Sequence, residues 1–159
     1  MKEVFIMKNY DEKTKIDVLN ALAFDGVTKA REIIEIANNE SEEKIMEEKM
    51  NKMVDNIVKE YNDFKEKMLK NTPAEIFENA FQISTYTDLL YYFENVDLDI
   101  LIDIIKDAFN NKGDITLFIE HPFILKELYN QFLNVEVAST NSWNDIEDLI
   151  KDYIIYTLL

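Results

Sequence analysis

The chain has 159 residues, of which 47% are hydrophobic and 31% charged, enough for one folded core and a solvated surface. It contains no cysteine, which excludes disulfides, thiolate zinc sites, iron–sulfur clusters and thiol nucleophiles and fits a reducing cytosol. The formal net charge of −15 argues against direct binding to nucleic acid or to anionic membranes.

Only two glycines and two prolines occur in the chain, and both residue types are needed for tight strand connections. We therefore predict an all-α fold, an irregular multi-helix bundle with one long amphipathic helix over about 41–70. At most a minor strand is expected near 3–7 or 134–138. The predicted domains are a helical hairpin over 1–40 and a helical bundle over 41–159, in which the long helix braces an acidic core over 72–159.

The amino-terminal region predicts two helices joined at Gly26. The first, over 13–24, places Ile16, Leu19, Ala23 and neighbouring apolar side chains at helical spacing. Thr28 can cap the second, which should end at Asn38 and Asn39. Its expected buried stripe is Ala30, Ile33, Ile34 and Ala37. Neither the role of this hairpin nor the choice of Met1 or Met7 as natural start follows from the sequence.

Ser41 is expected to open the long helix, whose apolar residues recur at steps of three and four. Those residues are Met46, Met50, Met53, Ile57, Tyr61, Phe64 and Met68. Core packing is one interpretation. The other is an intermolecular seam, because methionine repacks easily. That seam would use Met46, Met50, Met53 and Ile57 and would make the chain a homodimer or adaptor.

Several local signals divide the remaining chain into helices. Thr72 to Glu75 form a capping box with proline at the first helical position. A second helix should follow Ser84 and Thr85, and Asp97 should cap a third that ends near Asn110 to Gly113. Beyond it we expect, in order, a helical turn or extended piece over 114–120, a helix from Pro122, and a closing helix that begins near Ser142.

The negative charge is concentrated in the carboxyl-terminal part. Residues 1–70 hold 13 Lys/Arg and 16 Asp/Glu, a net −3, whereas residues 71–159 hold 4 and 16, a net −12. Helical spacing gathers many of these carboxylates into two ridges. The candidate acidic face is Glu94, Asp97, Asp99, Asp103, Asp107, Asp145, Glu147, Asp148 and Asp152. It can be a plain solvated surface, a docking face for Lys and Arg, or a nucleic-acid mimic.

No catalytic pattern is present. His121 is the only histidine, and neither phosphate-binding glycine loops nor serine hydrolase elbows occur. We expect no enzymatic activity, no catalytic or metal-ligating residues and no cofactor. No segment approaches the roughly 20 apolar residues that span a bilayer.

Part of the chain shows motifs shared with a known group of proteins. These are Tyr61, Phe64 and Leu69, the Thr72–Ile76 start, Asn79 and Ala80, the Leu89–Phe93 run with Glu94, Asn95, Asp97 and Leu98, and Asp145–Asp148. On these residues, about 61–153 resembles a family of uncharacterised helical domains of phages and mobile elements of low-GC Gram-positive bacteria. The stretch from Phe109 to Pro122 departs from the family pattern. The resemblance implies a phage or plasmid context and carries over no functional residue.

Together these features favour a non-enzymatic, cytoplasmic protein-binding module. The expected partner is a basic protein surface, for example on a nucleic-acid-handling protein. In the context that the resemblance implies, the chain would be an accessory or inhibitor, such as an anti-CRISPR or other anti-defence protein. The alternative is an oligomerisation or adaptor protein that uses the methionine-rich helix.

Overall fold

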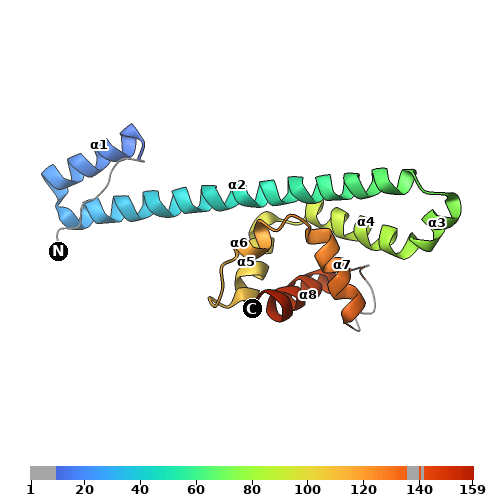
Figure 1. Ribbon diagram of the computed structural model, residues 1–159. Helices are drawn as coiled ribbons and strands as arrows, with labels where there is room; N and C mark the ends of the chain where they lie inside the picture. The colour runs from blue at the N-terminus through green and yellow to red at the C-terminus, as the bar shows by residue number, and fades with distance from the viewer. Residues whose placement is uncertain (1–9, 136–139, 141) are drawn as a thin grey trace. The chain divides into compact units, whose positions relative to one another are not determined.

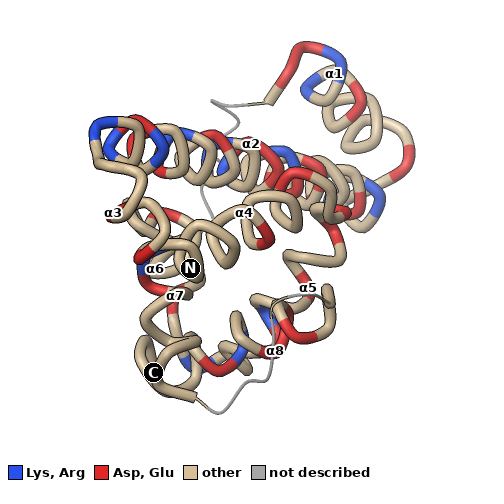
Figure 2. Tube along the Cα trace, turned by 90° about the vertical axis from the view of Figure 1, so that its right-hand side faces the viewer, with Lys and Arg blue, Asp and Glu red and all other residues tan. Residues whose placement is uncertain are grey.

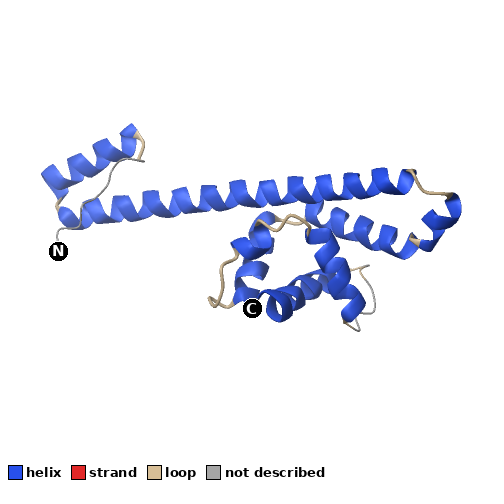
Figure 3. Ribbon diagram, viewed as in Figure 1, coloured by secondary structure: helices blue, strands red, loops and turns tan. Residues whose placement is uncertain are grey.

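The computed structural model describes residues 10–135, 140 and 142–159, and every secondary-structure element among them is helical (Figure 3). This confirms the predicted all-α fold with one long helix. The suggested strand at 3–7 and residues 136–138 of the second suggested strand lie outside the described residues, and Asn134 is helical. None of the described helices is both long and apolar enough to cross a membrane. The elements (Figure 1) are α1 (Glu12–Asn20), the π-helix η2 (Ala21–Asp25), α2 (Val27–Leu69), α3 (Pro73–Glu78), α4 (Ala80–Asn95), α5 (Leu98–Phe109), α6 (Thr116–Ile119), α7 (Ile124–Asn134), α8 (Trp143–Tyr153) and the π-helix η3 (Ile154–Leu158).

The chain divides into two compact units, an amino-terminal unit (Met1–Glu47) and a carboxyl-terminal unit (Glu48–Leu159). The boundary lies inside α2, seven residues beyond the predicted 40/41 boundary. The predicted helix end at Asn38 and Asn39 is wrong, because α2 continues through both residues and through Ser41. Asparagine and serine each cost only a few tenths of a kcal/mol in a helix interior, too little to end one without glycine or proline.

The amino-terminal unit is a helical hairpin. Asp11 caps α1 by accepting a hydrogen bond from the Thr14 N–H at 2.7 Å. Gly26, with φ of 95°, makes the turn into α2, and its N–H donates to the Ala21 carbonyl at 2.7 Å. The Tyr10 hydroxyl donates to the Asn38 side chain and ties α2 to the residue before α1.

The buried side of the amino-terminal hairpin carries small apolar side chains. Val18 and Ala21 are buried against Ala30, with Ile33 and Ile34 packed beside them. Ile16 and Leu19, which share the predicted helical spacing, are 53% and 60% exposed, and Ala23 is exposed as well. Two sides of the first, short helix of this hairpin carry apolar residues, one with Val18 and Ala21 and the other with Ile16 and Leu19. Helical periodicity alone does not tell which of the two sides is buried.

The carboxyl-terminal unit contains the main hydrophobic core. α7 packs on α4 and α8, and α5 packs on α8 and η3. Its largest fully buried side chains include Tyr92, Phe93, Phe109 and Phe118. α2 joins this core through buried Met50, Met53, Ile57 and Met68, as the core interpretation of the methionine stripe predicted.

Side-chain caps set three of the helix starts in this unit, those of α3, α5 and α8. The predicted capping box is present: Thr72 Oγ1 accepts from the Glu75 N–H at 3.3 Å, and Glu75 Oε2 accepts from the Thr72 N–H at 2.7 Å. The predicted helix break at Ser84 and Thr85 is wrong, since α4 runs through both and the junction with α3 lies at Asn79. The Thr85 hydroxyl donates to the Phe81 carbonyl at 3.0 Å, so this side chain bonds within the helix instead of ending it.

Candidate functional site

The acidic candidate site begins with α5. Asp97 caps the helix as predicted, accepting hydrogen bonds from the N–H groups of Asp99 at 2.9 Å and Ile100 at 3.5 Å. The helix ends at Asn110 and Asn111, which take left-handed φ values of 46° and 57°. Its buried side is formed by Leu101, Ile105, Ala108 and Phe109.

Asp99, Asp103 and Asp107 form a continuous row on the opposite side of α5, which we call the α5 ridge. At 100° per residue these three positions face directly away from the buried side, and all three side chains are exposed. Like charges four residues apart destabilise a helix by roughly 0.2–0.5 kcal/mol per pair. Within residues 10–135, 140 and 142–159, no ion pair offsets this repulsion at the ridge.

The α8 carboxylates divide between two sides of the helix. Ser142 Oγ caps α8 by accepting from the Asp145 N–H at 3.2 Å, and the buried side is Ile146, Leu149, Ile150 and Tyr153. Asp145 and Asp152 lie half-buried at one edge of that side, next to exposed Asp148. Asp148 pairs with Lys151 at 3.4 Å, a surface contact worth about 0–1 kcal/mol. α5 and α8 contact each other, so both acidic helices belong to one packed layer.

Glu147 lies on the other edge of α8, near Tyr92 of α4. The Tyr92 hydroxyl is buried and has no hydrogen-bond partner in the described part of the chain. Burial raises the pKa of this hydroxyl, and the negative charge of Glu147 raises the pKa further. The Trp143 ring lies edge-on to Tyr92, with centroids 5.5 Å apart. Glu147 therefore acts locally and is not on the side that carries Asp145, Asp148 and Asp152.

The remaining predicted acidic residues are dispersed. Glu94 is exposed near the end of α4, and Asp97 is occupied as a cap. In Figure 2, α2 carries acidic and basic positions side by side. The structure thus brings Asp99, Asp103 and Asp107 into one row, and places only Asp145, Asp148 and Asp152 together on a second helix.

Three of the four residues of the predicted oligomer seam are buried within a single chain. Met50, Met53 and Ile57 are 0%, 1% and 1% exposed within a single chain, so they are not available to a second one. Met46 alone remains partly exposed. The steps of three and four were correctly interpreted as one helix face, but that face is filled by the chain's own core.

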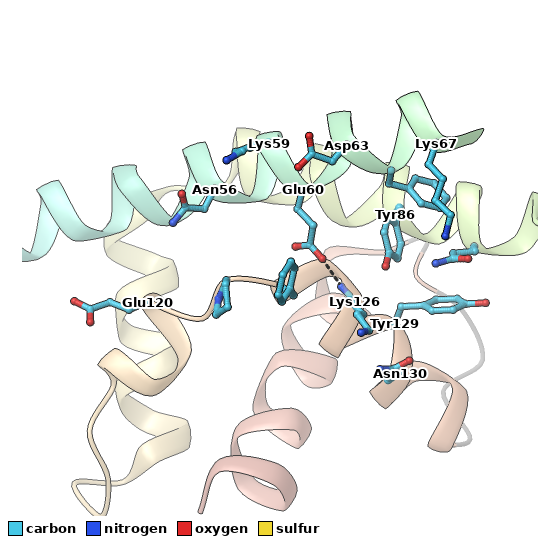
Figure 4. A pocket seen from close by; sticks show the side chains of 14 residues that line it. Asn56, Lys59, Glu60, Asp63, Lys67, Tyr86, Glu120, Lys126, Tyr129 and Asn130 are labelled. Carbon is cyan, nitrogen blue, oxygen red and sulfur yellow. Dashed lines mark hydrogen bonds between the residues drawn. The ribbon is translucent and has the colours of Figure 1, made fainter. Parts of the chain in front are cut away.

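A groove that the sequence did not predict lies in the carboxyl-terminal unit (Figure 4). It has a volume of about 730 Å³ and is bordered by α2, α4, the α6–α7 connection and α7. At its centre Glu60 reaches from α2 to the start of α7, where its two carboxylate oxygens accept from the N–H groups of Leu125 and Lys126, each at 2.9 Å. Burial raises the pKa of Glu60, and the two hydrogen bonds act in the opposite direction.

Aromatic rings form one wall of the groove. Phe64 and Tyr86 lie with centroids 4.5 Å apart, and Tyr86 meets Tyr129 edge-on at 5.8 Å. Three lysines, Lys59, Lys67 and Lys126, also line it. Lys126 is one of only four cationic residues after position 70, the one signal in the sequence that could have marked this region.

No metal or catalytic constellation is found in the part of the chain that the structure describes. No three His, Asp or Glu residues come together there as a metal-binding group. His121 Nδ1 accepts from the Phe123 N–H at 3.2 Å in the turn before α7. This contact gives the only histidine of the sequence a structural role.

The chain matches no protein-family model, no curated protein and no solved structure. The resemblance of residues 61–153 to phage-encoded helical domains therefore stays a prediction.

Proposed function

We propose that the chain is a non-enzymatic protein-binding module that docks its acidic α5 ridge on a Lys- and Arg-rich partner surface. The observation that supports this is the row of Asp99, Asp103 and Asp107 on the outward side of a well-packed helix, where the described residues form no ion pair with it. A rigid helix holds the three charges at fixed intervals of four residues, about 6 Å of helical rise. Ordering the carboxylates in advance lowers the entropic cost of binding.

The surrounding charge adds to the attraction. Residues 71–159 carry a net charge of −12, which accelerates encounter with a basic surface at low ionic strength. Asp145, Asp148 and Asp152 on α8 extend the acidic surface. In a mobile-element setting, such a protein would act as an accessory or inhibitor of a nucleic-acid-handling partner, a role that includes nucleic-acid mimicry and anti-defence activity.

A charge-matched comparison tests the ridge. The variant Asp99→Asn/Asp103→Asn/Asp107→Asn removes three negative charges from the ridge, and Glu42→Gln/Glu43→Gln/Glu47→Gln removes three from exposed positions on α2. Binding of a fluorescent eight-residue lysine/arginine peptide is followed by anisotropy from low to high salt. We expect about tenfold weaker binding and a shallower salt dependence for the ridge variant only. An equal loss of peptide affinity in both variants would show that only the net charge matters, and it would contradict the proposal that the α5 ridge is the binding site.

A second candidate function, self-association through the amino-terminal unit, has its own supporting observation. Ile16, Leu19 and Phe24 are 53%, 60% and 85% exposed, whereas the buried cluster that the described residues of this unit form is Val18, Ala21 and Ala30. Exposed clusters of large apolar side chains mark interaction surfaces. This surface replaces the methionine seam in the oligomer hypothesis.

Sedimentation tests that candidate. Ile16→Glu/Leu19→Glu should convert an oligomer to a monomer, whereas Asn39→Glu/Ser41→Glu adds the same charge at exposed positions of α2 and should leave the oligomer intact. A wild-type chain that sediments as a monomer at all concentrations would remove the hypothesis. Substitutions at Met50 or Met53 do not test self-association, because both side chains lie in the core and their replacement would destabilise the fold itself.

A further inference from the structure

The groove of the carboxyl-terminal unit combines features that the acidic ridge does not explain. Its volume of about 730 Å³ lies within the range of roughly 300–1,000 Å³ typical of small-molecule sites. All of its lining residues belong to α2, α4 and the region from Glu120 to Asn130, so a single folded unit forms the site.

Two of the three carboxylates in the groove are already engaged. Glu120 pairs with Lys49 at 3.3 Å, and Glu60 satisfies two backbone N–H groups at the start of α7. Asp63 is the third. The helix N-terminus is thus occupied by Glu60 and is not itself the binding site.

The lysines of the groove differ from these carboxylates. Lys59, Lys67 and Lys126 take part in none of the ion pairs formed within the described residues. Figure 4 shows Lys67 and Lys126 at the same end of the groove, with Tyr86, Tyr129 and Asn130, while Glu120 lies at the other end. The amide of Gln82 also lines the groove. In a chain of net charge −15, this end brings two lysine ammonium groups together with hydroxyl and amide groups that can each donate a hydrogen bond.

Flat apolar surfaces adjoin these donors. Tyr86 and Tyr129 meet edge-on at 5.8 Å, and Phe123, 54% exposed, contributes a ring from the α6–α7 connection. An aromatic ligand can stack on such rings, while lysine ammonium groups bind a carboxylate or phosphate by charge-assisted hydrogen bonds.

We propose that the end of the groove marked by Lys67 and Lys126 binds a small aromatic anion, a carboxylate or phosphate carried on an aromatic ring. The lysines hold the anionic group, and the aromatic ring lies in the groove that Tyr86, Phe123 and Tyr129 line. This site is independent of the α5 ridge, so the two proposals can fail separately.

Phenyl phosphate is the test ligand, with inorganic phosphate and phenol as its separate halves. Titration of the full chain at low salt, followed by two-dimensional amide NMR, should show saturable binding of phenyl phosphate with a Kd below about 1 mM. Each half alone should bind at least tenfold more weakly. The affinity should fall as salt rises, since the contact is ionic. Absence of saturable binding would overturn the proposal.

Matched variants locate the site. Lys67→Gln/Lys126→Gln should weaken phenyl phosphate binding at least tenfold, whereas Lys65→Gln/Lys112→Gln changes the net charge equally at exposed positions outside the groove and should have little effect. Phe123→Ala should weaken binding of phenyl phosphate but not that of inorganic phosphate. If the control lysines matter as much as the groove lysines, anion binding is a general surface effect and the assignment is wrong. Circular dichroism establishes that each variant is folded, and Lys67→Gln alone replaces the double variant if that fails to fold.

Discussion

The two units of the chain use their apolar residues in opposite ways. The carboxyl-terminal unit encloses large side chains such as Phe93, Leu101 and Phe109, whereas the buried core of the amino-terminal unit is Val18, Ala21 and Ala30. Full burial of a large aliphatic or aromatic side chain is worth about 1.5–3 kcal/mol. Most of the folding free energy must therefore come from the carboxyl-terminal unit, and the exposed apolar residues of the hairpin are available for other contacts.

The largest expected effect comes from truncating a core leucine. Leu101→Ala should lower the free energy of unfolding by about 2–5 kcal/mol, because Leu101 is fully buried and the substitution leaves a cavity. Urea unfolding followed by circular dichroism measures this loss. A cost below about 1 kcal/mol would contradict a well-packed core in this unit.

Tyr92→Phe should act in the opposite direction, raising the free energy of unfolding by about 1 kcal/mol. It removes a buried hydroxyl that has no hydrogen-bond partner within the described residues, and such a group costs about 1–3 kcal/mol. Because the folded-state pKa of Tyr92 is raised, wild-type stability should be retained below about pH 10 and fall as pH rises above it. Unfolding measured from pH 8 to 11 should show a smaller alkaline loss for Tyr92→Phe than for wild type.

Glu60→Ala should cost about 1 kcal/mol, because two N–H groups in the first turn of α7 lose their acceptor. The folded-state pKa of Glu60 is raised, so its contribution to stability is full below the unfolded pKa of about 4.3 and declines as pH rises through the folded pKa. The cost of the substitution should hence be larger at pH 4 than at pH 7. Glu66→Ala, at an exposed position of the same helix, is the control in paired thermal unfolding. A cost that grows from pH 4 to pH 7 would contradict this assignment.

The smallest effect is expected from a leucine-to-alanine substitution in the amino-terminal unit. Leu19→Ala should change the free energy of unfolding of a dilute, monomeric sample by no more than about 0.5 kcal/mol, since this side chain is largely exposed. Guanidinium unfolding measures the difference. If the loss approached that of Leu101→Ala, Leu19 would be buried in solution and the contrast between the units would fail.

Local chemistry explains what the sequence predicted well. Thr72, Asp97 and Ser142 each bond to backbone groups two or three residues away, so nearby sequence was sufficient to locate three helix starts. Breaks at Asn39 and Thr85 were predicted from residues that only disfavour helices, and the continuing hydrogen-bonded ladder outweighed them.

The candidate sites were predictable to different degrees. The spacing of Asp99, Asp103 and Asp107 is a property of one helix, and the sequence placed them correctly on one side. The groove brings together Lys67 and Lys126 from distant parts of the sequence. The predicted oligomer seam is not available to a second chain, because Met50 and Met53 are buried within the chain's own core. Both depend on how distant segments pack, which helical periodicity does not encode.

The contact of Glu60 with α7 has a consequence for the order in which the chain folds. Phe123, at the N-cap position of α7, provides no side-chain cap, and the acceptor comes from a residue 65 positions earlier than Leu125. Closing so long a loop is slow compared with forming a local turn. The first turn of α7 should consequently become stable only after α2 has docked, which makes completion of this helix a late, cooperative step.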